Sequence, residues 1–217
     1  MCKPNTHLTG KEYKMSEEVN WERSFYKNGA LKRETPYVNG VKHGTEKSFY
    51  EDKTLHKEIP FVNGKIHGVE KIYYDDGNLK SEKSFTNNET NGIWKGFHKN
   101  GNTFWEINLV NNEMNGVAKF FYENGNLRKE TPYVNDEIHG TEKEFRENGN
   151  LRKETPYVND EIHGLEKVFC KDGCLVSEIP YENGLINGVA KDFHKDGCLA
   201  CETTYENCKE VCRKEHK

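Results

Sequence analysis

One 24-residue unit is repeated eight times in this chain of 217 residues. Residues 124–140 recur letter for letter as residues 148–164, as expected of a copied unit. A fixed period of this size indicates a repeat array, in which each unit packs mainly on its neighbours. We therefore expect eight units over residues 20–207, residues 1–19 as an N-terminal cap or tail, and residues 208–217 as a C-terminal cap for which a short helix is one option. The units, numbered one to eight below, open at Asn20, Gly44, Gly68, Gly92, Gly116, Gly140, Gly164 and Gly188.

Each unit contains two turn signals about eleven residues apart, with short runs of Phe, Thr, Tyr and Val between them. The first signal is Asn-Gly or Asp-Gly in seven units, and Asp52-Lys53 departs from it. The second signal carries Asn in all eight units. Asn and Gly tolerate a positive φ, so both sites predict tight hairpin turns between strands. The asparagines of the second turn are Asn39, Asn63, Asn87, Asn111, Asn135, Asn159, Asn183 and Asn207.

These turns predict an all-β fold, an elongated single-layer array of eight antiparallel β-hairpins. If the first turn is a three-residue loop with a left-handed Gly, the sixth residue of a unit faces the twelfth, as Phe145 faces Leu151. The same register places the eighteenth residue, such as Tyr157, on that face as well, which would make one face apolar and the other polar. Two strands per unit lengthen the array by roughly 9–10 Å per unit, about 75–80 Å in all. Prolines such as Pro156 precede the aromatic residue, near the expected strand ends.

Two charged columns run through all eight units, one basic at the fourth residue and one acidic at the fifteenth, as in Lys143 and Glu154. Opposite charges suggest an ion-pair ladder, yet the simple register places the two columns on opposite faces. Either the prolines introduce a bulge that shifts the alternation, or the columns serve different neighbours. Both explanations remain open at the level of sequence.

Composition restricts the class of protein. Only 33% of residues are apolar and 31% are charged, which suits a thin array better than a globular core, while the regular aromatic positions argue against disorder. The net charge of −4 lacks the basic excess of a nucleic-acid-binding protein. No 18-residue apolar run is present. Seven cysteines, an odd number, without an apolar leader at the N-terminus predict a reducing compartment, and we expect a cytoplasmic protein.

The unit has the form Gly-x-Glu-Lys-x-Phe-Tyr-x-Asn-Gly-x-Leu-x-x-Glu-x-Pro-Tyr-Val-Asn-Gly-x-x-His. It closely resembles the MORN repeat, in particular the bacterial-type variant found in proteins labelled as YwqK-like antitoxins, over residues 20–207. The resemblance implies a twisted β-hairpin array that binds proteins or, as proposed for eukaryotic members, membranes. It carries no catalytic residue. On this basis we expect a MORN-type interaction module, antitoxin-like or immunity-like in role.

Cysteines raise the question of a metal. Cys170 and Cys174 flank the first turn of unit seven and face each other in the expected register, about 5.5 Å apart at Cα, which a disulfide accepts. His194 and Cys198 occupy the same places one unit later. A zinc site from all four would have to bridge roughly 14 Å between Cys170 and Cys198, which bonds near 2.3 Å cannot do. The series Cys198, Cys201, Cys208, Cys212 and His216 also imitates a zinc signature. We favour structural cysteines and expect neither metal nor cofactor.

Unit four departs most from the pattern. It has Trp94 where most units have Glu, His98 in place of the common Tyr, and Thr-Phe-Trp at residues 103–105 where most other units have Leu-x-Lys or Leu-x-Ser. The simple register places Trp94 and Phe104 on the polar face and Trp105 opposite. Exposed aromatic residues near the centre of a long surface are typical of a binding hot spot, whereas drift within a redundant array is the plainer interpretation. These four residues are our candidate binding site.

No phosphate-binding loop, nucleophile elbow or metalloprotease motif is present, and a repeated side chain makes a poor active site. We therefore expect a non-enzymatic protein that presents an extended β surface to a protein partner. The alternative is a peripheral membrane or scaffold protein that binds anionic lipid through the basic column. The apolar face needs a cover, by curling, by dimerisation or by a partner, and the sequence does not choose among these or set the oligomeric state.

Overall fold

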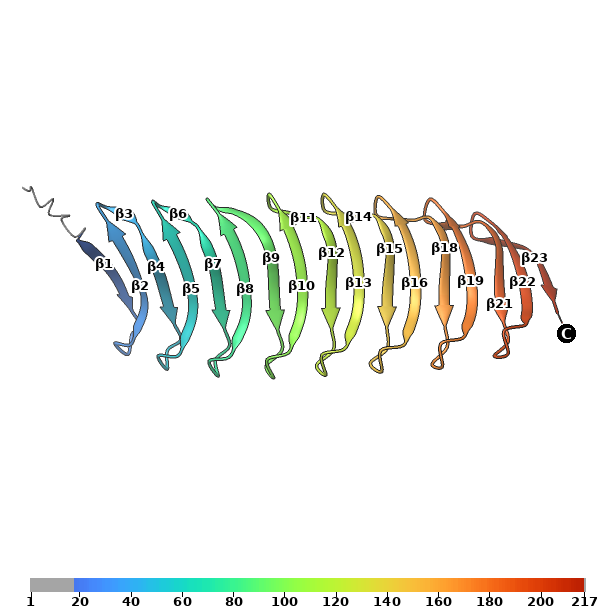
Figure 1. Ribbon diagram of the computed structural model, residues 1–217, viewed down its shortest axis with the longest axis horizontal. Coiled ribbons are helices and arrows are strands. Elements are labelled where there is room, and N and C mark those ends of the chain that lie inside the picture. Colours follow the sequence, from blue (N-terminus) through green and yellow to red (C-terminus); the bar gives the residue numbers. More distant parts are fainter. Residues whose placement is uncertain (1–17, 217) are drawn as a thin grey trace, which may run out of the picture.

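The computed structural model describes residues 18–216, which form one open antiparallel sheet of 23 strands. The hairpins stand side by side in chain order, from β1 at one end to β23 at the other, with turns along both long edges (Figure 1). The expected all-β hairpin array is therefore confirmed, and residues 18–216 contain no helix that would span a membrane. The expected tail at residues 1–19 lies outside the described residues except for its last two.

Most units contain two long strands followed by a two-residue strand that leads into the next opening glycine. The strands are β1 Val19–Phe25, β2 Leu31–Val38, β3 Val41–Lys42, β4 Gly44–Phe49, β5 Leu55–Val62, β6 Lys65–Ile66, β7 Gly68–Tyr73, β8 Leu79–Thr86, β9 Glu89–Phe97, β10 Thr103–Val110, β11 Glu113–Met114, β12 Gly116–Phe121, β13 Leu127–Val134, β14 Glu137–Ile138, β15 Gly140–Phe145, β16 Leu151–Val158, β17 Glu161–Ile162, β18 Gly164–Phe169, β19 Leu175–Glu182, β20 Leu185–Ile186, β21 Gly188–Phe193, β22 Leu199–Glu206 and β23 Lys209–Glu215. β23 replaces the short C-terminal helix that we considered.

The first turn is the predicted three-residue loop. In unit one, the Tyr26 N–H donates to the Ala30 carbonyl at 2.8 Å and the Gly29 N–H donates to the Tyr26 carbonyl at 3.0 Å, with Gly29 at φ +84°. The Asn28 side chain accepts the Ala30 N–H at 2.9 Å and so fixes the loop. Lys53 takes the place of the glycine in unit two and still adopts φ +75°. The conformation is therefore set by the hairpin and not by glycine alone.

The second turn has two residues, both with positive φ, such as Asn159 at +49° and Asp160 at +66°. This is the conformation that matches the twist of the flanking strands. The second residue also joins units: the Asp160 N–H donates to the Ile138 carbonyl at 3.0 Å, and the Ile138 N–H donates back to the Asp160 carboxylate at 2.7 Å. The prediction that asparagine marks this turn is confirmed.

A β-bulge shifts the alternation of side chains in every unit, but the prolines do not cause it. In unit six Phe145 pairs with Leu151 and Glu144 pairs with Lys153, so Arg152 is the extra residue. Beyond the bulge Lys143 lies opposite Glu154, and their side chains are 3.7 Å apart. Our explanation by a bulge is thus correct, but the bulge lies next to the first turn and not at the prolines. One extra residue moves every later side chain of the strand to the other face.

The sheet consequently has two faces that differ from the expected apolar and polar pair. The ladder face carries the ion-pair columns together with the sixth and twelfth residues of each unit, such as Phe145 and Leu151. The tyrosine face carries the third, fourteenth, sixteenth and eighteenth residues, which in unit six are Glu142, Lys153, Thr155 and Tyr157. The expectation that Tyr157 and its equivalents share a face with Phe145 and Leu151 is wrong because of the bulge. Most of the buried side chains lie on the tyrosine face.

The proline column lies inside the second long strand and not at its end. Pro156 pairs with Thr141 on one side, and its carbonyl accepts the His163 N–H on the other. The ladder is interrupted just beyond, at Gly164 with φ +114°, so the missing proline N–H faces no acceptor there. A Cβ on Gly164 would stand 3.1 Å from the Pro156 ring. The opening glycine, which has no Cβ, therefore leaves room for the proline ring of the preceding unit.

Candidate functional site

At three unit boundaries a carboxylate buried on the tyrosine face, that of Glu46, Glu142 or Glu166, joins the neighbouring units. The Thr131 hydroxyl donates to Glu142 of the next unit at 2.8 Å, and Lys129 lies 2.8 Å from the same oxygen. Thr155, Lys153 and Glu166 repeat this arrangement at 2.9–3.0 Å. Burying a carboxylate is costly unless it is paired and hydrogen-bonded, so each joint depends on all three side chains.

Where the joint lacks Glu, its partners change together. Ala118 lies opposite Ile107 across the unit boundary by continuation of the register, which gives an apolar joint. At the boundary between units three and four, Lys83 pairs with Trp94, and the Lys83 ammonium lies 4.8 Å from the Trp94 ring centroid. A cation against an aromatic face is attractive. Trp94 therefore has a defined place in the joint between units three and four.

The structure brings the four candidate residues of unit four together in one aromatic cluster. Trp94 lies on β9, His98 follows β9, and Phe104 and Trp105 lie on β10. The ring centroids of Trp94 and Trp105 are 5.8 Å apart, those of Phe104 and Trp105 are 5.0 Å apart, and those of His98 and Phe104 are 4.6 Å apart. All four side chains are half-buried. We call Trp94, His98, Phe104 and Trp105 the aromatic cluster.

The expectation that Trp105 points away from Trp94 is wrong. Phe104 is the bulge residue of unit four, since Thr103 pairs with Phe97 and Trp105 pairs with Gly96. The bulge turns Trp105 onto the tyrosine face beside Trp94, and Phe104 reaches the same side. The whole cluster therefore lies on the tyrosine face, which is the face that the simple register predicted to be polar.

Gly96 and Phe120 belong to this site, and sequence reasoning missed both. Gly96 is buried beneath the Trp105 indole, and any Cβ at Gly96 would overlap that ring. Phe120 lies directly opposite Trp105 on the next strand, β12. A signal was present for the glycine, because Gly96 is the only glycine at the fifth place of a unit. It occurs in the same unit as the tryptophan that needs the space.

His98 also has a structural role. Its Nε2 lies 3.2 Å from the Phe121 carbonyl of the next unit. Tyr26, Tyr50, Tyr74 and Tyr122 each donate to the equivalent carbonyl at 2.7–2.8 Å, and the Arg146 guanidinium does so at 2.8 Å. His98 thus continues a row of bonds between units while its ring contacts Phe104.

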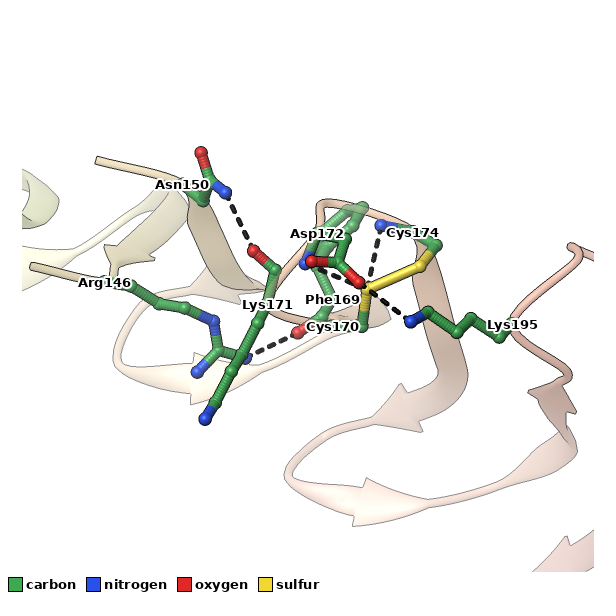
Figure 2. Close-up of a disulfide and its surroundings, with 8 residues drawn as sticks. All are labelled: Arg146, Asn150, Phe169, Cys170, Lys171, Asp172, Cys174 and Lys195. Atoms are coloured by element: carbon green, nitrogen blue, oxygen red, sulfur yellow. Dashed lines mark hydrogen bonds and ion pairs between the residues drawn. A yellow bond between two sulfur atoms is a disulfide. The ribbon is translucent and has the colours of Figure 1, made fainter. Parts of the chain in front are cut away.

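In unit seven Cys170 takes the place of the tyrosine, and the row of bonds between units stops there (Figure 2). Cys170 forms a disulfide with Cys174 across the first turn of unit seven, with the two Cα atoms 5.3 Å apart, as the facing positions predicted. A disulfide leaves neither sulfur available as a thiolate ligand, so the zinc tetrad with His194 and Cys198 is not formed. Residues 18–216 contain no group of three or more His, Cys, Asp or Glu side chains placed to hold a metal ion.

The C-terminal cysteines do not gather either. Cys201 is buried, whereas Cys198, Cys208 and Cys212 are exposed free thiols. Cys212 lies on β23 opposite Thr204, and His216 lies 3.1 Å from Glu202. The helix that would have brought Cys208 and Cys212 to one side is absent, because the Asn207-Cys208 turn starts a hairpin.

Comparison with known protein families identifies the type of repeat in part of the chain. Five stretches of the chain match the MORN repeat variant. The stretches are residues 22–39, 42–63, 66–87, 114–135 and 138–159. Among curated proteins, none matches the chain. The matched stretches leave out residues 88–113, which contain the aromatic cluster, and also residues 160–217.

Proposed function

We propose that this chain is a non-enzymatic interaction protein that binds a protein partner through the tyrosine face around unit four, in an antitoxin-like or immunity-like role. One observation carries the proposal. The aromatic cluster occurs once in eight otherwise similar units, and its rings form a contiguous, partly exposed group. MORN repeats are typically protein- or lipid-binding modules, and the residues that dominate binding at protein interfaces are enriched in tryptophan, tyrosine and arginine.

The ion pairs made by the basic column favour a protein partner over an anionic lipid surface. Six of the basic column's eight side chains form ion pairs with the acidic column, with nitrogen–oxygen distances from 2.9 Å for Lys95 and Glu106 to 4.0 Å for Lys167 and Glu178. A lysine near an anionic membrane contributes only about 1 kcal/mol, and a neighbouring carboxylate opposes that attraction. Flotation with anionic vesicles tests the alternative directly, and co-migration of the protein with the lipid would favour it.

The partner can be sought by affinity capture of the tagged chain from the cytosol of its source cells, followed by mass spectrometry. We expect one protein at a stoichiometric ratio, lost with Phe104→Ala. Phe25→Ala is the control for loss of an aromatic side chain, because Phe25 lies on β1, at one end of the array, and is more exposed than the half-buried Phe104 (Figure 1). Equal capture by wild type and Phe104→Ala would contradict the proposed site. An antitoxin-like role further requires that the captured protein inhibit growth alone and not when the chain is co-expressed.

A further inference from the structure

The aromatic cluster continues into a row of arginines in the next two units. Arg128 and Arg152 occupy the same bulge place in units five and six that Phe104 occupies in unit four. The Arg128 guanidinium carbon lies 6.0 Å from the Phe104 ring centroid, so the two side chains are in contact range of each other. We call Phe104, Arg128 and Arg152 the bulge strip.

An open cleft of about 300 Å³ lies between the two arginines. It is lined by Tyr122, Arg128, Lys129, Glu144, Phe145 and Arg152. Aromatic and charged residues thus meet in one hollow, on a sheet that is otherwise a single layer. A hollow of this kind can hold a side chain of a partner.

The basic side chains that line the cleft differ in whether a carboxylate pairs with them. Lys129 is occupied by the buried Glu142, at 2.8 Å. Arg152 contacts Glu144 through Nη1 alone, at 3.3 Å, and its side chain is 59% exposed. Within residues 18–216, no carboxylate lies within ion-pair distance of the exposed Arg128. A guanidinium has five N–H donors, so both arginines retain donors for a carboxylate.

The strip repeats once per unit, and this spacing selects a ligand conformation. Two strand spacings separate equivalent places in successive units, which is about 9.4–9.8 Å. A peptide in the polyproline II conformation presents every third residue on one side, about 9.3 Å apart. A peptide β-strand presents every second residue, about 6.8 Å apart, and does not match.

We propose that the bulge strip binds an extended acidic segment of the partner, with an aromatic residue followed at three-residue intervals by two carboxylates. The aromatic residue packs on Phe104 and Trp105, and the carboxylates bond to Arg128 and Arg152. This inference rests on the proposed function, since it specifies the chemistry of the protein partner. It adds to the aromatic cluster two charged residues that determine specificity.

The test uses two blocked peptides, Trp-Pro-Pro-Glu-Pro-Pro-Glu and the reverse sequence, because the strip does not define a direction. Binding to the full chain is measured by calorimetry at low salt. We expect one peptide to bind and the double variant Arg128→Gln/Arg152→Gln to reduce its affinity at least tenfold, since charge-assisted hydrogen bonds are lost. Replacing both glutamates of the peptide by glutamine should have the same effect.

Two further variants test whether the charges next to the bulge strip control the affinity for the peptide. Glu144→Gln removes a carboxylate that competes for Arg152, so we expect it to strengthen binding. Lys80→Gln is the matched control, because Lys80 occupies the bulge place of unit three and is exposed; it should leave binding unchanged. The inference is overturned if neither peptide binds at millimolar concentration, or if Lys80→Gln weakens binding as much as the double arginine variant.

Affinity capture separates this inference from the proposed function. A partner that is lost with Phe104→Ala but retained by Arg128→Gln/Arg152→Gln would overturn the inference and leave the proposed function intact. Arginine-dependent binding of the peptide together with an empty capture would do the reverse, since the ligand chemistry would hold without a cellular partner. Thermal unfolding of each variant confirms that a loss of binding is not a loss of fold.

Discussion

At some positions of this array, the residue type is restricted by the space beside a neighbouring side chain or by the backbone conformation of a turn. Gly96 shows the first effect, because the Trp105 indole lies across it and excludes a Cβ. Lys53 shows the second, because it holds the left-handed place that glycine holds in the other seven first turns. Each residue has a counterpart in an equivalent unit, and that counterpart provides an internal control.

Gly96→Ala should destabilise the fold by about 1–3 kcal/mol, the usual cost of forcing extra volume into a packed site. The Trp105 ring has to move, and Trp94 and Phe104 move with it. Urea unfolding measures the change. Ser48→Ala, at the same place in unit two, is the control and should have little effect. Equal stability of Gly96→Ala and wild type would show that the Trp105 ring does not lie over Gly96.

Lys53→Gly should stabilise the fold by up to about 1 kcal/mol, because a non-glycine residue at positive φ carries a strain of that order. The converse change, Gly149→Lys, places lysine at the same site in unit six, where a Cβ meets nothing within 4 Å. It should destabilise by a similar amount. Thermal unfolding of both variants checks the pair, and changes of the same sign would contradict the argument.

At the scale of elements, the strands are held together by two kinds of charged contact. Ion pairs on the ladder face join the two long strands of one unit and are only half-buried, so solvent weakens each of them. Carboxylates on the tyrosine face join successive units and are buried, so their partners matter more. Glu46 is one of these, with Thr35 at 2.9 Å and Lys42 at 2.8 Å.

Burial by itself raises the pKa of Glu46, but hydrogen bonds from Lys42 and Thr35 outweigh it and hold the pKa below the ordinary value. A lowered pKa in the folded state means that ionised Glu46 stabilises the fold above the pKa of the unfolded chain, and that this stabilisation is lost as the pH falls through the folded pKa. We expect the stability of wild type to fall more steeply than that of Glu46→Gln between about pH 5 and pH 3.

Denaturant unfolding across that pH range measures the difference between the two proteins. Lys42→Met should flatten the curve in part, because it removes one of the bonds that lower the pKa of Glu46. Parallel curves for wild type and Glu46→Gln would show that this joint does not respond to protonation.

At the scale of the whole molecule, the array is close to one-dimensional. Each hairpin pairs with the hairpins before and after it, and residues 18–216 form a single layer (Figure 1). The stability of such an array is approximately the sum of unit terms and nearest-neighbour terms. Removing one unit should therefore leave the rest folded.

Deletion of residues 140–163 joins two identical boundaries, since residues 124–140 and 148–164 have the same sequence. We expect a folded protein whose maximum dimension is shorter by about 9.5 Å, the width of two strands. Small-angle X-ray scattering and circular dichroism measure the length and the strand content. Loss of strand content would show that contacts beyond nearest neighbours hold the sheet together.

Sequence determined the period, the hairpins and the facing cysteines, because these depend on the chemistry of a few consecutive residues. Asn159 and Asp160 adopt positive φ for local reasons, and the Gly29 loop forms as its sequence predicts. Tertiary structure alone decided which side chains share a face. That outcome depends on the single extra residue, such as Arg152 or Phe104, that each strand leaves unpaired. Because side chains alternate every residue, this one insertion brought Lys143 opposite Glu154 and gathered Trp94, Phe104 and Trp105 into one site.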